Sequence, residues 1–268
     1  MKSSFINCLN KSIAVYEYGS NNHPALFMIH GNSVDAGFFE PLINLLELKY
    51  HVIILDLPGH RQSEPWKKEE FGRENLALLF NAVLDNYKIR ETNAFGFSMG
   101  GFMLLECFDL VPAIKKIAIA GHPPLHSMED MSKAYYLNED SSLFLKGPLS
   151  DEEIERLYNS VISLNDEQLK GKIIESIRNT SPEFREGCLN MAQQTGDQVA
   201  RLNKSRMPIA VIHASEDKAV QFDYLQSLQI HNLWEQKIQT ISGCGHFCIT
   251  DKTEELATML DKFYASKD

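Results

Sequence analysis

The sequence predicts an α/β fold, with a mostly parallel sheet, helices on both of its faces and a helical cap inserted between two strands. Three observations predict it. Short apolar runs alternate with longer segments of helical period, several of these runs are apolar throughout, and one long stretch lacks any such run. Alternation of strand and helix is typical of a parallel sheet, and continuous apolar runs are typical of strands covered on both faces.

Seven apolar runs bounded by turn residues are the predicted strands. They lie at 12–18, 25–30, 51–56, 93–97, 116–120, 209–213 and 237–241. The segments between them place apolar residues at a period of 3.6, which indicates helices with one buried face. These predicted helices lie at about 38–48, 73–88, 99–110, 222–230 and 252–266.

The stretch 122–205 interrupts this alternation. Its segments 150–163, 166–179 and 182–195 have helical period, and it contains no apolar run typical of a buried strand. About 80 residues is too long for an ordinary crossover connection. We therefore interpret 122–205 as a helical cap over the site, on a core formed by 1–121 and 206–268. The alternative is that these helices belong to the outer layer of the core.

Composition limits the classes of function. The chain has 268 residues, of which 44% are hydrophobic and 23% charged, as in an ordinary globular protein. Its net charge of −10 argues against nucleic acid and anionic membrane as partners. The sequence contains no apolar stretch long enough to span a membrane and does not start like a secretory signal. Five cysteines, an odd number, indicate a reducing compartment, so we expect a cytoplasmic protein.

A glycine-rich motif follows the predicted strand 93–97. Residues 96–100 (GFSMG) fit the pattern G-x-S-x-G, and a predicted helix begins directly after them. In a nucleophile elbow the turn from strand to helix is so tight that it needs glycine two positions before and after the serine. The motif predicts Ser98 as a nucleophile at the carboxyl edge of the sheet. It does not fit a dinucleotide fingerprint, which needs glycine where Ser98 stands, or a phosphate-binding loop ending in Gly-Lys-Ser/Thr.

A serine hydroxyl is a weak nucleophile and needs a base, which in turn needs an acid to orient it. His246 lies in a glycine-flanked loop after the last predicted strand, at the sheet edge where Ser98 emerges, and is the predicted base. The acid is expected between them, because sites built on a nucleophile elbow have the chain order serine, acid, histidine. Asp217, just after strand 209–213, is the preferred acid, and the adjacent Glu216 is the alternative.

Two backbone N–H groups are expected to stabilise the oxyanion that forms on the substrate. One belongs to Met99, the residue after the nucleophile, and the other to the loop 30–33 (HGNS) after the strand 25–30. The sequence does not decide between Asn32 and Ser33. We favour the Ser33 N–H as the donor and the Asn32 side chain as a substrate contact.

Four motifs in register resemble the α/β-hydrolase family. They are residues 30–32 (HGN), 56–60 (DLPGH), 96–100 (GFSMG) and 245–246 (GH). The resemblance covers the chain outside 122–205 and implies an eight-stranded, mostly parallel sheet with acyl-transfer chemistry at its carboxyl edge. Serine at position 98 differs from the dehalogenase and epoxide-hydrolase branches, whose nucleophile is aspartate. Arg61 stands where many members have glycine and is expected at the rim of the pocket.

Three further segments look like the N-acyl-homoserine lactonases built on this fold, namely 30–33 (HGNS), 121–124 (GHPP) and 232–235 (NLWE). This resemblance implies that Tyr158 of the predicted helix 150–163 contacts the substrate. It also implies an apolar acyl channel in the cap, which we expect to be supplied by Leu143, Phe144, Leu157 and Ile162.

Together these residues predict a serine hydrolase that cleaves a small-molecule carboxylic ester or lactone, with an N-acyl-homoserine lactone as one candidate. The mechanism requires no cofactor. Cys244 and Cys248 flank His246, but zinc needs three or four properly directed ligands, so we expect no metal and interpret both as packed residues. The alternative from another class is a small-molecule signalling receptor on a hydrolase scaffold, with slow turnover. The natural substrate and the oligomeric state stay open.

Overall fold

The computed structural model describes residues 1–161 and 167–267. At its centre lies one sheet of eight strands in the order β1-β2-β4-β3-β5-β6-β7-β8. β2 pairs antiparallel with both of its neighbours, and all other neighbouring strands are parallel. The strands are β1 (Lys2–Cys8), β2 (Lys11–Tyr18), β3 (Ala25–Ile29), β4 (His51–Leu55), β5 (Thr92–Phe97), β6 (Ile114–Ala120), β7 (Ile209–Ala214) and β8 (Gln239–Ile241). The predicted fold class is confirmed.

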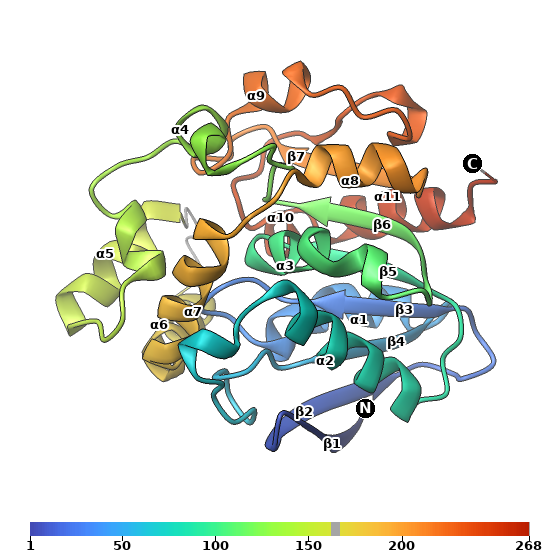
Figure 1. Cartoon of the computed structure of the whole chain (residues 1–268), viewed down its shortest axis with the longest axis horizontal. Helices are drawn as coiled ribbons and strands as arrows, with labels where there is room; N and C mark the ends of the chain where they lie inside the picture. The colour runs from blue at the N-terminus through green and yellow to red at the C-terminus, as the bar shows by residue number, and fades with distance from the viewer. Residues whose placement is uncertain (162–166, 268) are drawn as a thin grey trace.

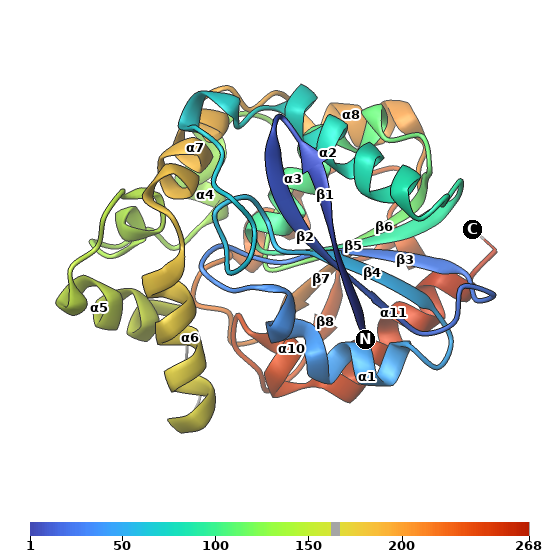
Figure 2. The ribbon, with the colours of Figure 1, turned by 90° about the horizontal axis from the view of Figure 1, so that it is seen from below.

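Helices cover both faces of this sheet. Figures 1 and 2 show α2 (Arg73–Asn86), α3 (Met99–Cys107) and α8 (Gln198–Ser205) on one face. The helices α1 (Glu40–Leu46), α10 (Cys248–Asp251) and α11 (Thr253–Ala265) lie on the other face, and α9 (Phe222–Ser227) follows β7.

The two apolar layers arise from the alternation of side chains along each strand. In β4, Ile53 and Leu55 pack into the core layer that contains Phe80 of α2. Their neighbours Val52 and Ile54 pack into the opposite layer, which contains helices α1 and α11. Because every residue of β4 is buried, each of its large side chains stabilises the fold by roughly 1.5–3 kcal/mol.

We refer to residues 122–205, between β6 and β7, as the insertion. Its described part contains α4 (Met131–Ala134), the short 3-10 helix η5 (Ser141–Leu145), α5 (Asp151–Val161), α6 (Glu167–Asn179), α7 (Pro182–Gln193) and α8. Figures 1 and 2 show α4 to α7 gathered at the end of the sheet toward which the β6 arrow points. α8 instead lies beside α3 on the sheet face, so the last part of the insertion belongs to the helical layer.

Sequence analysis missed two kinds of element. β1 was not predicted, because this edge strand begins with three polar residues, buries only Ile6 and Cys8, and exposes Phe5. It joins β2 through Leu9 and Asn10, both with positive φ, as in a tight hairpin turn. The helices α4 and α8 were also missed, since four and eight residues give little periodic signal. Within the described residues, no helix combines the length and apolar composition needed to cross a membrane.

Candidate active site

Ser98 occupies the turn between β5 and α3. Its backbone has φ 50° and ψ −120°, a strained conformation for a residue with a side chain. A Cβ on Gly96 would lie 2.7 Å from the Gly100 carbonyl oxygen, and one on Gly100 would lie 2.3 Å from the carbonyl oxygen of Ile29. Only glycine fits at these two positions, which is why the turn can be so tight. The turn leaves Ser98 half-buried at the carboxyl end of β5.

His246 lies against Ser98. Its Nε2 is 3.1 Å from the Ser98 Oγ, and its Nδ1 is 3.0 Å from Oδ2 of Asp217. His246 belongs to the loop between β8 and α10, and Asp217 to the loop after β7. The carboxyl ends of three strands of one sheet, β5, β7 and β8, therefore supply the three residues. Gly121, at φ +70°, provides the room for the imidazole, because a Cβ there would lie 2.8 Å from the His246 Cε1.

Asp217 is held as a carboxylate. Burial alone would raise its pKa, but the charge and hydrogen bond of His246 and the backbone N–H groups of Ala219 and Val220 together lower it. Those N–H groups donate to the Asp217 Oδ1 over 2.7 and 3.2 Å. The alternative acid, Glu216, is exposed to solvent, and the structure therefore brings Asp217 and not Glu216 to His246.

The loop 30–33 lies beside Ser98, but its N–H groups differ from the expectation. The N–H of Ser33 donates to the His60 Nε2 over 3.3 Å, so it is directed away from a substrate at Ser98. The preference for Ser33 as oxyanion donor is therefore corrected. Within the described residues no acceptor is recorded for the N–H of Asn32, which lines the same cavity as Ser98 and Met99. Met99 is the first residue of α3, where an N–H has no acceptor within the helix.

The Asn32 side chain is already hydrogen-bonded within the protein. Its Nδ2 donates to the Phe144 carbonyl oxygen over 2.7 Å, and its Oδ1 accepts from the Ser33 hydroxyl over 2.7 Å. These contacts connect the loop 30–33 to the insertion. Asn32 also lines the cavity that contains Ser98, and its expected role as a substrate contact stays a prediction.

Arg185 of α7 supports the same loop, and sequence analysis missed it. The side chain is buried, at 2% exposure, and its Nη2 donates to the Ser33 Oγ over 3.3 Å and to the Ile177 carbonyl over 2.6 Å. Burial lowers the pKa of its guanidinium to about 10. Its helical surroundings carry no motif, so only the three-dimensional contacts identify it.

A small cavity of about 130 Å³ opens beside Ser98 and His246. Its polar wall includes Asn32, His122 and Tyr135. The rest of the wall is largely apolar, formed by Met99, Phe102, Leu125, Met128, Met131, Phe144, Leu145, Ala192 and Ala219. Because most of these side chains come from α3 and the insertion, the insertion shapes the space next to the serine.

The predicted acyl channel is only partly correct. Phe144 lines the cavity, whereas Leu143 and Leu157 are buried elsewhere and Ile162 lies outside the described residues. Tyr158 does not line it either. Its ring is buried and lies 5.3 Å from the Lys170 ammonium, so the structure does not bring Tyr158 to the serine.

The two cysteines beside His246 pack inside the protein. Both are buried free thiols, and burial raises the pKa of Cys244 to about 11 and that of Cys248 further. The Cys244 Sγ donates to the carbonyl oxygen of Ile241. In the part of the chain that the structure describes, histidine, cysteine and acidic side chains form no group of three or more that could hold a metal ion.

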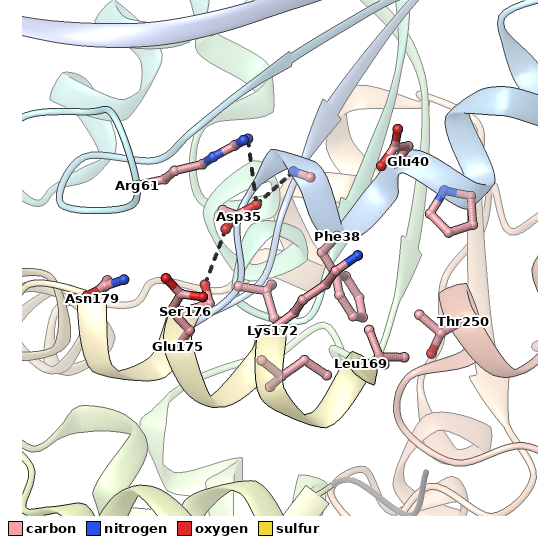
Figure 3. Close-up of a pocket in the computed structure, with 14 residues that line it drawn as sticks. Asp35, Phe38, Glu40, Arg61, Leu169, Lys172, Glu175, Ser176, Asn179 and Thr250 are labelled. Carbon is pink, nitrogen blue, oxygen red and sulfur yellow. Dashed lines mark hydrogen bonds and ion pairs between the residues drawn. The ribbon is translucent and has the colours of Figure 1, made fainter. Parts of the chain in front are cut away.

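A second and larger hollow, of about 590 Å³, lies between α6 and the segment 34–41. Figure 3 shows that its wall is rich in polar side chains, with Asp35 directed at Arg61 and at Ser176 of α6. The Asp35 carboxylate lies 4.0 Å from the Arg61 guanidinium and 3.5 Å from the Ser176 hydroxyl. Arg61, expected at the rim of the pocket beside Ser98, lines this second hollow instead.

The arrangement of sheet, elbow and facing histidine agrees with a family comparison. The alpha/beta hydrolase fold family matches residues 24–253, which is most of the chain. The protein therefore belongs to the α/β-hydrolase fold family and is a hydrolase of this fold.

Several individual proteins are similar to the chain over most of its length. The chain is 26% identical over 269 residues to the uncharacterized hydrolase YugF of Bacillus subtilis (strain 168). This alignment covers 92% of the chain and 93% of the relative. It is 22% identical to the pimeloyl-(acyl-carrier protein) methyl ester esterase of Nitrosomonas europaea, covering 90% and 96%. Among solved structures, a mutant of the N-acyl homoserine lactonase AidH complexed with N-hexanoyl homoserine lactone superposes with a TM-score of 0.90 at 24% identity, covering 98% and 97%. This likeness agrees with the predicted resemblance.

Proposed function

We propose that this protein is a serine hydrolase that cleaves a carboxylic ester or lactone with a short acyl or alkyl group through an acyl-enzyme. The observation that carries the proposal is the chain from the Ser98 Oγ through His246 to Asp217, with contacts of 3.1 and 3.0 Å, beside an apolar cavity. A nucleophile, its base and the group that orients the base are in hydrogen-bond reach, which is the geometry of covalent acyl transfer.

In the proposed mechanism, His246 Nε2 takes the hydroxyl proton of Ser98 while the Ser98 Oγ attacks the substrate carbonyl. Asp217 holds the imidazole by its Nδ1–H and stabilises the imidazolium that forms. The N–H groups of Asn32 and Met99 donate to the oxyanion; loss of one such donor costs roughly 3 kcal/mol in other enzymes. His246 then protonates the leaving alkoxide. A water molecule, deprotonated by His246, attacks the acyl-enzyme, and His246 returns that proton to the Ser98 Oγ as the acid leaves. No cofactor takes part.

The size of the cavity limits the substrate. At about 130 Å³ it is smaller than the usual ligand site of some 300–1,000 Å³, which favours short chains. A lactone of the N-acyl-homoserine type is the first cyclic substrate to test, because of the superposition with AidH. We also propose that the insertion acts as the cap of this site. The cytoplasmic location inferred from the cysteine count stays a prediction.

A hydrolysis screen tests the proposal. p-Nitrophenyl esters from acetate to octanoate and homoserine lactones with the same acyl chains would be given to the wild type and to Ser98→Ala. Multiple turnover that peaks at short chains and is lost in Ser98→Ala supports the proposal. A single turnover followed by arrest would favour the receptor alternative, and absence of hydrolysis would refute the proposal.

A further inference from the structure

A buried chain of hydrogen bonds leads from α8 to the small cavity. The Arg201 guanidinium contacts the Glu106 carboxylate of α3 over 3.0 Å, and Glu106 accepts a hydrogen bond of 2.7 Å from Nε2 of Gln198. The Gln198 Oε1 lies 3.3 Å from the His122 Nε2, and the His122 Nδ1 lies 2.6 Å from the Tyr135 hydroxyl. The mechanism above uses none of these five side chains, although His122 and Tyr135 line the cavity at Ser98.

The direction of each hydrogen bond in this chain can be assigned. The backbone N–H of Leu125 donates to the Gln198 Oε1 over 3.0 Å, and a backbone N–H can only donate. This fixes the orientation of the Gln198 amide, with its oxygen toward Leu125 and His122 and its nitrogen toward Glu106. The oxygen can only accept, so the His122 Nε2 must carry the hydrogen between these two residues.

His122 therefore offers only a lone pair at its other nitrogen. The ring is 4% exposed, and burial lowers its pKa to about 3, which keeps it neutral. A neutral imidazole with hydrogen on Nε2 has an acceptor at Nδ1. The Tyr135 hydroxyl must then donate its only hydrogen to His122, and its oxygen can offer nothing but lone pairs to a molecule in the cavity.

The backbone of Tyr135 is tied to the loop that carries the acid of the site. Its carbonyl oxygen accepts a hydrogen bond of 2.8 Å from the Gln221 Nε2, and the residue forms an antiparallel bridge with Val220. Val220 is also a donor to Asp217. Tyr135 and Ser98 line the same cavity of about 130 Å³, so we expect a ligand whose carbonyl reaches Ser98 to contact this tyrosine as well.

We propose that Tyr135 is a hydrogen-bond acceptor in the substrate site, held in that role by His122 and Gln198. It would select esters or lactones that carry an N–H or O–H group near the reacting carbonyl. This inference rests on the proposed function and specifies its substrate class.

A matched pair of esters tests the inference. Methyl N-butanoylglycinate carries an amide N–H, and methyl 4-oxoheptanoate has the same skeleton with CH₂ in its place. Their intrinsic reactivities differ, so the informative quantity is the ratio of the two kcat/KM values in wild type divided by the ratio in Tyr135→Phe. Loss of one hydrogen bond predicts a quotient of about 3 to 10. A purely structural role of Tyr135 predicts a quotient of 1, because both esters would be affected equally, and that result would overturn the inference.

A second variant keeps the test usable if Tyr135→Phe does not fold, as judged by its thermal unfolding. His122→Phe removes the acceptor of the tyrosine hydroxyl, which can then turn and donate, so the preference for the N–H ester should fall here too. An unchanged preference refutes the inference. The proposed function is tested separately from the inference, by the hydrolysis of p-nitrophenyl butanoate by the wild type and its loss in Ser98→Ala. If that ester is hydrolysed and neither ester of the pair is, the inference alone is wrong; if none is hydrolysed, the proposed function is wrong as well.

Discussion

Two hollows border the segment that follows β3, and they differ in size and in lining. The larger, about 590 Å³, is lined by charged and polar side chains such as Asp35, Arg61 and Lys172 (Figure 3). The smaller, about 130 Å³, is mostly apolar and contains Ser98 and His246. Charged side chains that stay partly exposed to solvent, such as Arg61 and Asp35, attract each other weakly. A few polar groups that converge in an apolar pocket are instead typical of ligand sites. The convergence of Ser98, His246 and Asp217, and not the volume of the hollow, is therefore the reason to choose the smaller cavity as the candidate site.

Ser98→Ala tests most directly whether the chemistry takes place in the small cavity, and it should give the largest effect on kcat. Removing the nucleophile should lower kcat for p-nitrophenyl butanoate by at least about 10⁴-fold, as for other serine hydrolases. Thermal unfolding checks that the fold is retained. Activity above a tenth of the wild-type value in a folded variant would mean that the small cavity is not where the chemistry takes place.

Asp217→Asn should give the next largest loss. Asparagine leaves His246 without its carboxylate partner, and kcat should fall by about 10² to 10⁴-fold. Glu216→Gln is the matched control, because it removes the adjacent but exposed carboxylate, and we expect a change below about twofold. The reverse ranking would assign the acid to Glu216.

Filling each hollow separately compares them directly. Ala192→Leu adds bulk to the wall of the small cavity and should reduce the butanoate-to-acetate ratio of kcat/KM by about tenfold, within the range that one or two methylene groups produce in a pocket. Asn179→Leu places the same leucine side chain in the wall of the larger hollow and should leave this ratio unchanged. Equal shifts in both variants would show that the substrate occupies the larger hollow.

The free energy of unfolding at acidic pH should also depend on His122, which lines the small cavity. Burial lowers the pKa of His122 from 6.5 to about 3. Between these values the unfolded chain binds the proton and the folded chain does not, so the free energy of unfolding falls as the pH drops through this window and is fully retained above it. His122→Phe should remove about 3–5 kcal/mol of this pH dependence in urea titrations. The buried His30 and His60, whose pKa values are also lowered, account for part of the remainder. Parallel curves for wild type and variant would contradict the assignment.

The smallest effect is expected at Arg61. Arg61→Gly restores the residue that many family members carry. It removes a contact of 4.0 Å to Asp35 and a cation–π contact of 5.6 Å to the Tyr16 ring, both from a partly exposed side chain. We expect less than a twofold change in kcat/KM for p-nitrophenyl butanoate. A tenfold change would show that the larger hollow participates in catalysis.

The reactive residues of the small cavity and the wall around them differ in how far the sequence could predict them. Ser98, His246 and the preferred Asp217 each follow a strand. Such positions are marked by short motifs, because the backbone there tolerates few residue types. The wall of the small cavity was mostly missed, because Met128, Ala192 and Ala219 carry no pattern and meet only after folding. Tyr158 and Ser33 show a second limit. A residue can have the expected chain position and yet place its ring or its N–H elsewhere, as Ser33 does toward His60.

The hydrogen bonds between the loop 30–33 and the insertion have a consequence for modular redesign. Asn32 donates to the Phe144 carbonyl, and Arg185 donates to Ser33. A chimera that received a foreign insertion would acquire a new pocket wall and would at the same time lose the tethers of the loop next to the nucleophile. We therefore expect the substrate range and the turnover rate of such a chimera to change together. Directed evolution that exchanges helices of the insertion would need to retain Arg185 and the backbone path at Phe144. Only then could the substrate range change without a change in the turnover rate.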